Sequence, residues 1–303
     1  MSENDFPEAS IEDGFEVIEA QPKPTAPEDD AVVTPLPEQP EGPRKPRLCL
    51  MGEFSAGKST LSNLLLGTPA LPVNVTATQL PPVWISQGDE DPYRVALDDQ
   101  EFDIELDRLN DVSVDDTSYV RVFKHSKFLE HCDLIDMPGI SDPNMDAEVW
   151  QRVLPIADMI VWCTHATQAW RQSEAAVWST IPSDLQAKSF LLLTRMDKIL
   201  SERDKSRVVK RVAREAEEFF AGLYPISLTR AMAGRDDPEL WAASGAEAFH
   251  ADLLTALDAI HADNLAEEAS RTPARDPNRV VAPMRIKPRP LTARRPSRNS
   301  VSL

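Results

Sequence analysis

The sequence lacks any long apolar run. No stretch approaches 18 consecutive apolar residues, so no membrane-spanning helix is expected. The first 47 residues carry 12 acidic and only 4 basic side chains, which is unlike the basic start of a secretory signal. Cysteine is also scarce: Cys49, Cys132 and Cys163 each lie in an apolar run, and none has a spacing typical of a metal site. We therefore expect a cytoplasmic protein with reduced, buried thiols.

A surplus of basic residues is missing as well, because the formal net charge is −18. Residues 271–303 carry 9 basic side chains and 1 acidic one, which cancels the charge of the acidic first 47 residues. The whole surplus of −18 therefore lies on residues 48–270. Such an acidic region binds phosphate backbones poorly, so nucleic acid is not expected as a partner.

Proline is concentrated at the two ends, with 9 of the 26 in the first 47 residues and 6 in the last 33. Few large apolar side chains accompany them. We predict a disordered acidic tail over residues 1–46, a folded domain over 47–265 and a disordered basic tail over 266–303. Near an anionic membrane each basic side chain contributes up to about 1 kcal/mol, so peripheral attachment to the inner face of a membrane is a second expectation.

The central part alternates short apolar runs with longer amphipathic ones, which predicts an α/β fold with a mostly parallel sheet flanked by helices. Runs such as 159–163 and 190–194 are apolar throughout, as in strands covered on both faces. The expected strands are 47–51, 82–86, 119–123, 132–136, 159–164, 189–194 and 224–227. Helices are expected to begin near Lys58, Asp146, Gln172, Glu202 and Gly245.

The strongest motif is the run of nine residues from Gly52 to Thr60, which fits GxxxxGK[ST] between an apolar strand and a helix. This is the pattern of a P-loop nucleotide-binding fold. Its members are Gly52, Glu53, Phe54, Ser55, Ala56, Gly57, Lys58, Ser59 and Thr60. The glycines let successive N–H groups converge on a phosphate, Lys58 would bridge the β- and γ-phosphates, and the Ser59 hydroxyl would bind Mg²⁺. A chance match in a strand–turn–helix unit is the alternative.

A second motif, DxxG, lies at the end of the predicted apolar strand 132–136 and comprises Asp136 and Gly139. The aspartate can hold Mg²⁺ through a water, and the Gly139 N–H can meet a γ-phosphate because no Cβ intervenes. An ordinary turn is the alternative.

A third motif, Thr194-Arg195-Met196-Asp197, resembles the [NT]KxD element that recognises guanine. A carboxylate at Asp197 can accept from guanine N1–H and N2–H₂, whereas adenine leaves it unpaired, so guanine is favoured. Arg195 stands where lysine is usual, and Asp197 could instead cap a helix. The loop ending at Ser227 would supply a backbone N–H to guanine O6.

The stretch 71–82 has the composition of an exposed loop that leads into a strand. Mg²⁺ in such sites needs a second hydroxyl ligand, for which Thr78 is our first choice and Thr76 the second. A plain surface threonine is the alternative.

These motifs together resemble the dynamin superfamily of large GTPases, in particular bacterial dynamin-like proteins. The phrase GEFSAGKST, the LPVNVTATQLPP stretch, DMPGISDPN and TRMD carry the resemblance, over roughly residues 47–262. It implies Mg²⁺-dependent binding of GTP and GDP and hydrolysis of GTP. The catalytic residues it implies are Ser55, Lys58, Thr78 and Gly139, and the Mg²⁺ ligands are Ser59, Thr78 and, through water, Asp136.

The resemblance has departures. Eukaryotic dynamins place glutamine where Phe54 stands, and Ile140 replaces the glutamine that orients water in many small GTPases. Hydrolysis is thus expected to need a G-domain homodimer or a partner. About 40 residues follow the last predicted helix, too few for a stalk, so a stalk-bearing partner is expected. The alternative function is a slow GTP-binding module that recruits partners through its charged tails.

Overall fold

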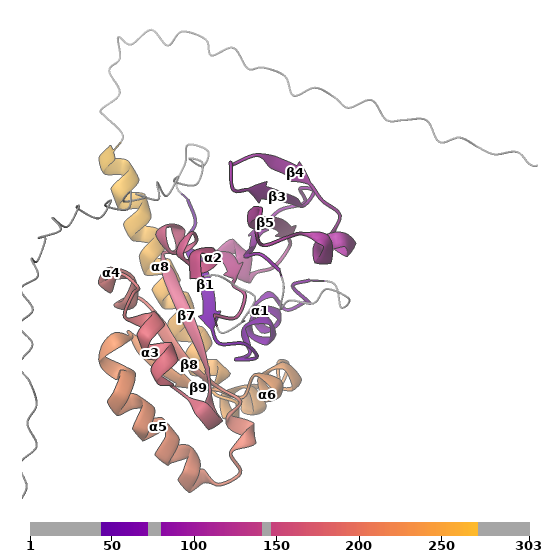
Figure 1. The fold of residues 1–303 in the computed structure, drawn as a ribbon. Coiled ribbons are helices and arrows are strands. Elements are labelled where there is room, and N and C mark those ends of the chain that lie inside the picture. Colours follow the sequence, from indigo (N-terminus) through magenta and orange to yellow (C-terminus); the bar gives the residue numbers. More distant parts are fainter. Residues whose placement is uncertain (1–43, 72–79, 141–146, 272–303) are drawn as a thin grey trace, which may run out of the picture. The chain divides into compact units, whose positions relative to one another are not determined.

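A computed structural model describes residues 44–71, 80–140 and 147–271. Thr76 and Thr78 lie outside these ranges, as do most of the two predicted tails. Within the described residues, nine strands form one sheet in the order β4-β3-β5-β2-β6-β1-β7-β8-β9 (Figure 1). Five of the eight strand pairings are parallel, which confirms the predicted mostly parallel sheet.

Seven of these strands correspond to predicted ones, six of them closely, while the last begins and ends two residues earlier than the predicted 224–227. They are β1 (Arg47–Gly52), β2 (Val83–Gln87), β5 (Thr117–Lys124), β6 (Asp133–Asp136), β7 (Met159–His165), β8 (Phe190–Thr194) and β9 (Gly222–Pro225). Sequence patterning missed the hairpin of β3 (Tyr93–Ala96) and β4 (Glu101–Asp103). All three residues of β4 are exposed, so the hairpin shows no apolar run that would mark a strand.

Five helices begin at or next to the predicted positions, and three short ones were not predicted. The first group is α1 (Lys58–Leu66), α2 (Ala147–Gln151), α3 (Gln172–Trp178), α5 (Glu202–Ala216) and α8 (Ala246–Arg271); the second is α4 (Ser183–Gln186), α6 (Leu228–Ala233) and α7 (Pro238–Ala243). The short 3₁₀ helices are η1 (Leu106–Asp111), η2 (Phe128–Glu130), η3 (Leu154–Ile156), η4 (Ala166–Gln168), η5 (Met196–Lys198) and η6 (Glu217–Phe219). Because α8 continues to Arg271, it passes the domain boundary expected at residue 265.

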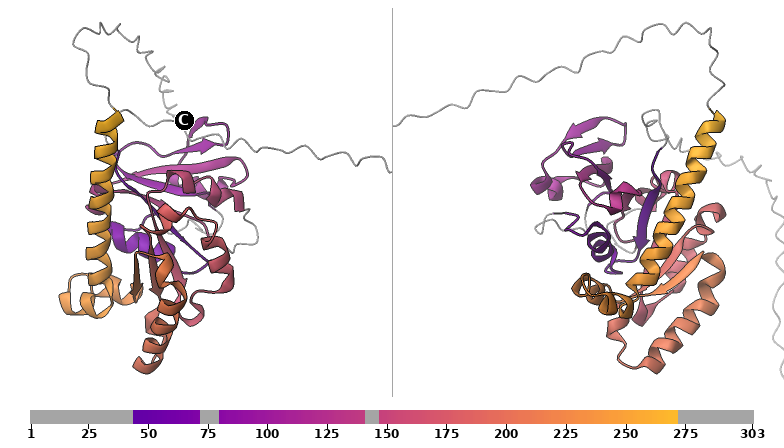
Figure 2. Two further views of the ribbon diagram at one scale, coloured as in Figure 1. Left: turned by 90° about the vertical axis from the view of Figure 1, so that its left-hand side faces the viewer. Right: turned by 180° about the vertical axis from the view of Figure 1, so that it is seen from behind.

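The central strand β1 explains how the core is divided. Successive strand residues point to opposite faces, so Leu48 and Leu50 pack with α1 and α8 on one face. Cys49 and Met51 pack with α3 and α5 on the other. Figure 2 shows α8 on one side of the strands and α3 and α5 on the other. All of β1 is buried, as expected for a strand covered on both faces.

The predicted burial of the thiols is confirmed, since Cys49, Cys132 and Cys163 are all free and buried. Burial raises the pKa of the Cys163 thiol to about 12, so it stays protonated at neutral pH. In the part of the chain that the structure describes, no helix is long and apolar enough to cross a membrane.

Candidate functional site

The loop between β1 and α1 has the backbone geometry that the GxxxxGK[ST] motif predicts. Gly52 and Gly57 have φ of +137° and +101°, in the region that favours glycine. A Cβ on Gly52 would lie 2.1 Å from the carbonyl oxygen of Cys163, so no larger residue fits there. Gly52 therefore lies against the backbone of the neighbouring strand β7, and the loop that follows leads into the start of α1, where helix N–H groups are free.

Lys58, the first residue of α1, is buried and lies inside this loop. Its Nζ donates to the carbonyl oxygens of Gly52 (2.9 Å) and Glu53 (2.8 Å). Burial lowers the pKa of Lys58, and the nearby Asp136 carboxylate opposes that shift. Its ammonium group is therefore held at the place where a phosphate would replace the two carbonyls as its partner.

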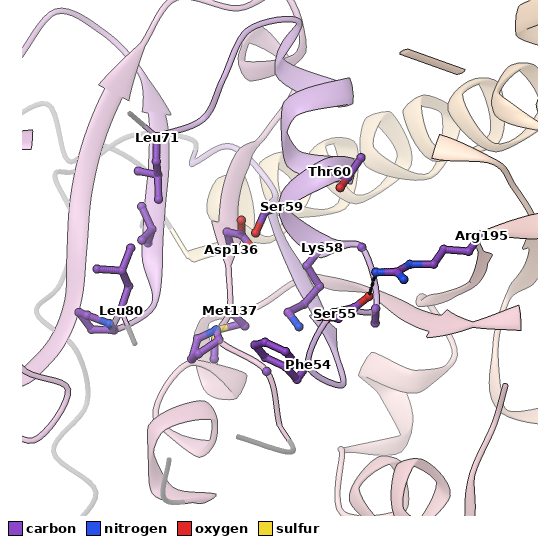
Figure 3. A pocket seen from close by; sticks show the side chains of 16 residues that line it. Phe54, Ser55, Lys58, Ser59, Thr60, Leu71, Leu80, Asp136, Met137 and Arg195 are labelled. Carbon is purple, nitrogen blue, oxygen red and sulfur yellow. Dashed lines mark hydrogen bonds between the residues drawn. The ribbon is translucent and has the colours of Figure 1, made fainter. Parts of the chain in front are cut away.

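A cavity of about 270 Å³ opens beside the loop (Figure 3). Its walls bring together residues 54–60 of the P-loop, residues 136–139 of the DxxG motif and Arg195. Leu71 and Leu80, which flank the segment containing Thr76 and Thr78, also line it. The first and second motifs, 78 residues apart in sequence, therefore share one pocket.

The oxygen donors in this cavity suit a hard cation. Ser59 and Asp136 both line it, and hydroxyl and carboxylate oxygens are the ligands that Mg²⁺ prefers together with phosphate and water. Removal from solvent raises the pKa of Asp136 to about 6, with Lys58 opposing the rise. Among residues 44–71, 80–140 and 147–271, no three His, Cys, Asp or Glu side chains gather as a metal cluster, so a cation here would depend on phosphate oxygens as well.

Gly139 approaches the P-loop closely. A Cβ on it would lie 2.8 Å from the Cα and 2.9 Å from the backbone nitrogen of Phe54. The glycine of the DxxG motif is therefore required by a backbone-to-backbone approach, as well as by any contact of its N–H with a ligand.

The third motif joins the P-loop through two side chains. Thr194 Oγ1 lies 2.7 Å from the carbonyl oxygen of Ala56, and Arg195 Nη2 donates to that of Ser55 (Figure 3). Asp197 accepts from the Ser227 hydroxyl at 2.8 Å, which orients its carboxylate. Residues 194, 195, 197 and 227 thus lie together next to the loop, as the motif predicts.

One detail differs from the sequence prediction. The backbone N–H groups of Ile226 and Ser227 donate to the carbonyls of Leu193 and Ser244. Ser227 acts as the N-cap of α6 through its side chain, so an N–H for guanine O6 would have to come from the first turn of that helix.

Sequence patterns missed two side chains that touch the P-loop. The Glu53 carboxylate accepts from Arg171 Nη1 at 3.2 Å and from Ser173 Oγ at 2.9 Å. Both donors belong to the start of α3, where no motif points to a role. Only the predicted helix start near Gln172 could have drawn attention to them.

Comparisons with known proteins agree with this geometry. Residues 48–196 match the Dynamin family. Dynamin-like protein 2 of Campylobacter jejuni is 25% identical over 163 residues, which is 51% of this chain and 26% of that protein.

Two solved structures of an oligomerised bacterial dynamin pair, described as sensing and tethering membranes, each align with a TM-score of 0.53. They share 18% and 20% identity with this chain, and cover 75% and 74% of it. The alignments span 41% and 37% of their own chains, so the likeness concerns the fold of one part of those proteins.

Proposed function

The chain carries a dynamin-superfamily G domain, and on that premise we propose that it binds GTP and GDP with Mg²⁺ and hydrolyses GTP to GDP and phosphate. The observation that supports this most strongly is the convergence of three motifs on one pocket. The P-loop and the DxxG motif line the cavity, and Arg195 links the third motif to the same loop.

Phosphate binding falls to the loop and Lys58. The N–H groups around Gly57 and the start of α1 supply partial positive charge, and Lys58 exchanges its two carbonyl partners for β- and γ-phosphate oxygens. Such charge-assisted bonds contribute about 1.5–3 kcal/mol each. Ser59 would bind Mg²⁺ directly and Asp136 through water, with Thr78, or else Thr76, as the second hydroxyl. Bound Mg²⁺ would neutralise charge that develops on the transferred phosphoryl group.

Base recognition falls to Asp197. Its carboxylate, held by Ser227, would accept from guanine N1–H and N2–H₂, and the Arg195 guanidinium would lie along the base. Adenine would leave the carboxylate without a donor, so GTP is preferred over ATP.

Water activation is the weakest part of the site. Ile140 cannot orient a water as glutamine does, so Thr78 and a second molecule would complete the arrangement. We therefore propose that turnover rises when the G domain pairs with another copy or with a stalk-bearing dynamin-like partner. Because Ile140 cannot orient the attacking water, a second candidate function is a GTP-binding module with very slow turnover.

Phosphate release from GTP tests this proposal. The purified chain is assayed over a range of protein concentrations, with and without anionic liposomes that could engage the basic residues 271–303. Turnover that rises with concentration or lipid supports the hydrolase. Tight GTP binding without turnover supports the module, and no GTP binding rejects both.

A further inference from the structure

The side chain of Glu53 points away from the cavity and toward α3. Its two carboxylate oxygens are used separately, Oε1 by the Ser173 hydroxyl and Oε2 by the Arg171 guanidinium. The carbonyl oxygen of the same residue accepts from Lys58 and from the Ala56 N–H. Glu53 therefore connects the start of α3 to the lysine that would bind phosphate. We call the Arg171 and Ser173 side chains the α3 anchor.

A buried carboxylate places the α3 anchor. Glu174 is only 2% exposed and accepts from Trp162 Nε1 at 3.0 Å, from Thr164 Oγ1 at 2.9 Å and from the Arg171 N–H at 2.9 Å. Trp162 and Thr164 belong to β7, the neighbour of β1. Because a buried carboxylate is tolerated only when its oxygens are satisfied, these three bonds fix where α3 begins.

The turn before the α3 anchor is strained. Trp170 has φ of +56°, a conformation that is uncommon for an aromatic residue. Its N–H donates to Thr164 Oγ1 at 3.1 Å, the hydroxyl that itself donates to Glu174. The ring packs edge-on against Trp162 and Phe220. The strain is held in place by the network around Glu174.

Thr164 is also connected to a second point of the P-loop, the carbonyl group of Ala56, through the side chain of Thr194. Its carbonyl oxygen lies 3.1 Å from Thr194 Oγ1, which lies 2.7 Å from the carbonyl oxygen of Ala56. The P-loop is therefore contacted at residue 53 by side chains of α3 and at residue 56 by the Thr194 side chain of β8. Thr164 is connected to both contacts, to the first through Glu174 and to the second through Thr194.

We propose that Glu174 is a positioning residue for the P-loop: it sets the α3 anchor, which holds Glu53 and through it Lys58 in the geometry for phosphate. The proposal rests on the proposed nucleotide binding, to which it adds a specific coupling between α3 and the phosphate site. Glu174 itself does not line the cavity, so it acts through the residues that it positions, and the tests below address the route through Arg171, Ser173 and Glu53.

One double variant tests the anchor without disturbing the buried network. In the full chain, Arg171→Ala combined with Ser173→Ala is expected to raise the Kd for GTP by about three- to tenfold, since one partly exposed ion pair and one hydrogen bond are lost. Because the anchor organises the loop before chemistry, KM should rise in step while kcat changes less than about twofold. Arg214→Ala, which removes an exposed arginine from α5, is the matched control and should behave as the parent.

Coupling is tested with Glu53→Ala. Alone it should weaken GTP binding to the same degree as the double variant, and adding it to Arg171→Ala and Ser173→Ala should weaken binding no further. Independent, additive losses would overturn the proposal. Glu174→Gln keeps the shape of the side chain but places an amide NH₂ group where the carboxylate accepts hydrogen bonds, so it should reproduce the rise in KM. Arg171→Lys should bind GTP more tightly than Arg171→Ala, because it keeps a positive charge.

Hydrogen exchange at the amides of residues 53–58 in the nucleotide-free chain separates this proposal from the proposed function. Faster exchange in the Arg171→Ala, Ser173→Ala protein supports the coupling even if GTP does not bind, in which case only the proposed function fails. Normal GTP binding with parent-like exchange and Kd in these variants overturns the role of α3. If Glu174→Gln fails to fold, the variants of Arg171, Ser173 and Glu53 still test whether α3 is coupled to the P-loop.

Discussion

Arg195 Nη2 donates to the carbonyl oxygen of Ser55 at 2.8 Å, which joins the base-recognition motif directly to the P-loop. Arg195 adopts a left-handed backbone with φ of 55°. Ser55 is itself left-handed, with φ of 57°. Two uncommon backbone conformations thus meet across one hydrogen bond, and the phosphate and base regions of the site are coupled there.

Arg195→Ala is expected to weaken GTP binding by about two- to tenfold, because one exposed hydrogen bond from a charged donor is lost along with the plane beside the base. Arg195→Lys should bind within a few-fold of the parent, since lysine is the usual residue there. Fluorescent GTP titration measures both, with Arg203→Ala as an exposed control. Parent-like binding of Arg195→Ala would show that the contact has no role in the site.

Asp197→Asn is expected to weaken GTP binding by at least about tenfold and to favour xanthosine triphosphate, whose O2 carbonyl can accept from the new amide. The measurement is competition between the two nucleotides for the full chain. Asp184→Asn, at an exposed position in α4, should leave the preference for GTP unchanged. An unaltered preference in Asp197→Asn would mean that another group recognises the base.

Gly139→Ala is expected to displace residue 54 and reduce nucleotide affinity, since the added methyl group would lie within 3 Å of two Phe54 backbone atoms. Phe54→Ala should not rescue it, because the closest clashes are with backbone rather than with the ring. Binding of GTP to the single and double variants checks both statements. Full rescue by Phe54→Ala would place the clash in the side chain instead.

The histidine contribution to stability should fall as the pH is lowered below about 6.5, whereas Asp136, whose pKa burial raises to about 6, changes stability in the opposite direction. Burial, with Arg235 and His131 nearby, lowers the pKa of His250, and burial with Arg195 nearby lowers that of His165. The unfolded chain therefore takes up protons at a higher pH than the fold does, and stability is lost as the pH falls toward the folded pKa values.

Urea unfolding of the parent and of His250→Gln at pH 7.5 and 5.5 isolates the contribution of His250. The change in stability between the two pH values should be less favourable for the parent than for His250→Gln, because only the parent has His250 to protonate. The same change in both proteins would contradict the role of His250.

Elements could be predicted from the sequence where the structure requires a particular kind of residue. Buried parallel strands have continuous apolar runs, and the P-loop needs glycine where φ is positive, so β1, β7, β8 and residues 52–60 could be located in advance. The exposed strand β4 and the short helix α7 have neither signature. They depend on pairing with β3 and packing against α8, which no local pattern shows.

The same limit applies to the site. Lys58, Asp136 and Asp197 belong to motifs with fixed spacing, whereas Arg171 and Ser173 reach Glu53 from about 120 residues away because β7 lies beside β1. Their role depends on the order of strands in the sheet and on the hydrogen bonds of Glu174, and neither produces a pattern that can be recognised in the sequence.

Whether the P-loop binds guanine nucleotides is decided by equilibrium titration of the full chain with GTP, GDP and ATP in Mg²⁺, for the parent and for Lys58→Ala. We expect GTP and GDP to bind and ATP to bind far more weakly. Lys58→Ala should lose at least about tenfold in affinity, because a charge-assisted phosphate contact is removed. Lys188→Ala, an exposed lysine outside the pocket, should bind as the parent does. Equal affinity for ATP and GTP, or a Lys58→Ala protein that binds GTP as tightly as the parent, would contradict the account.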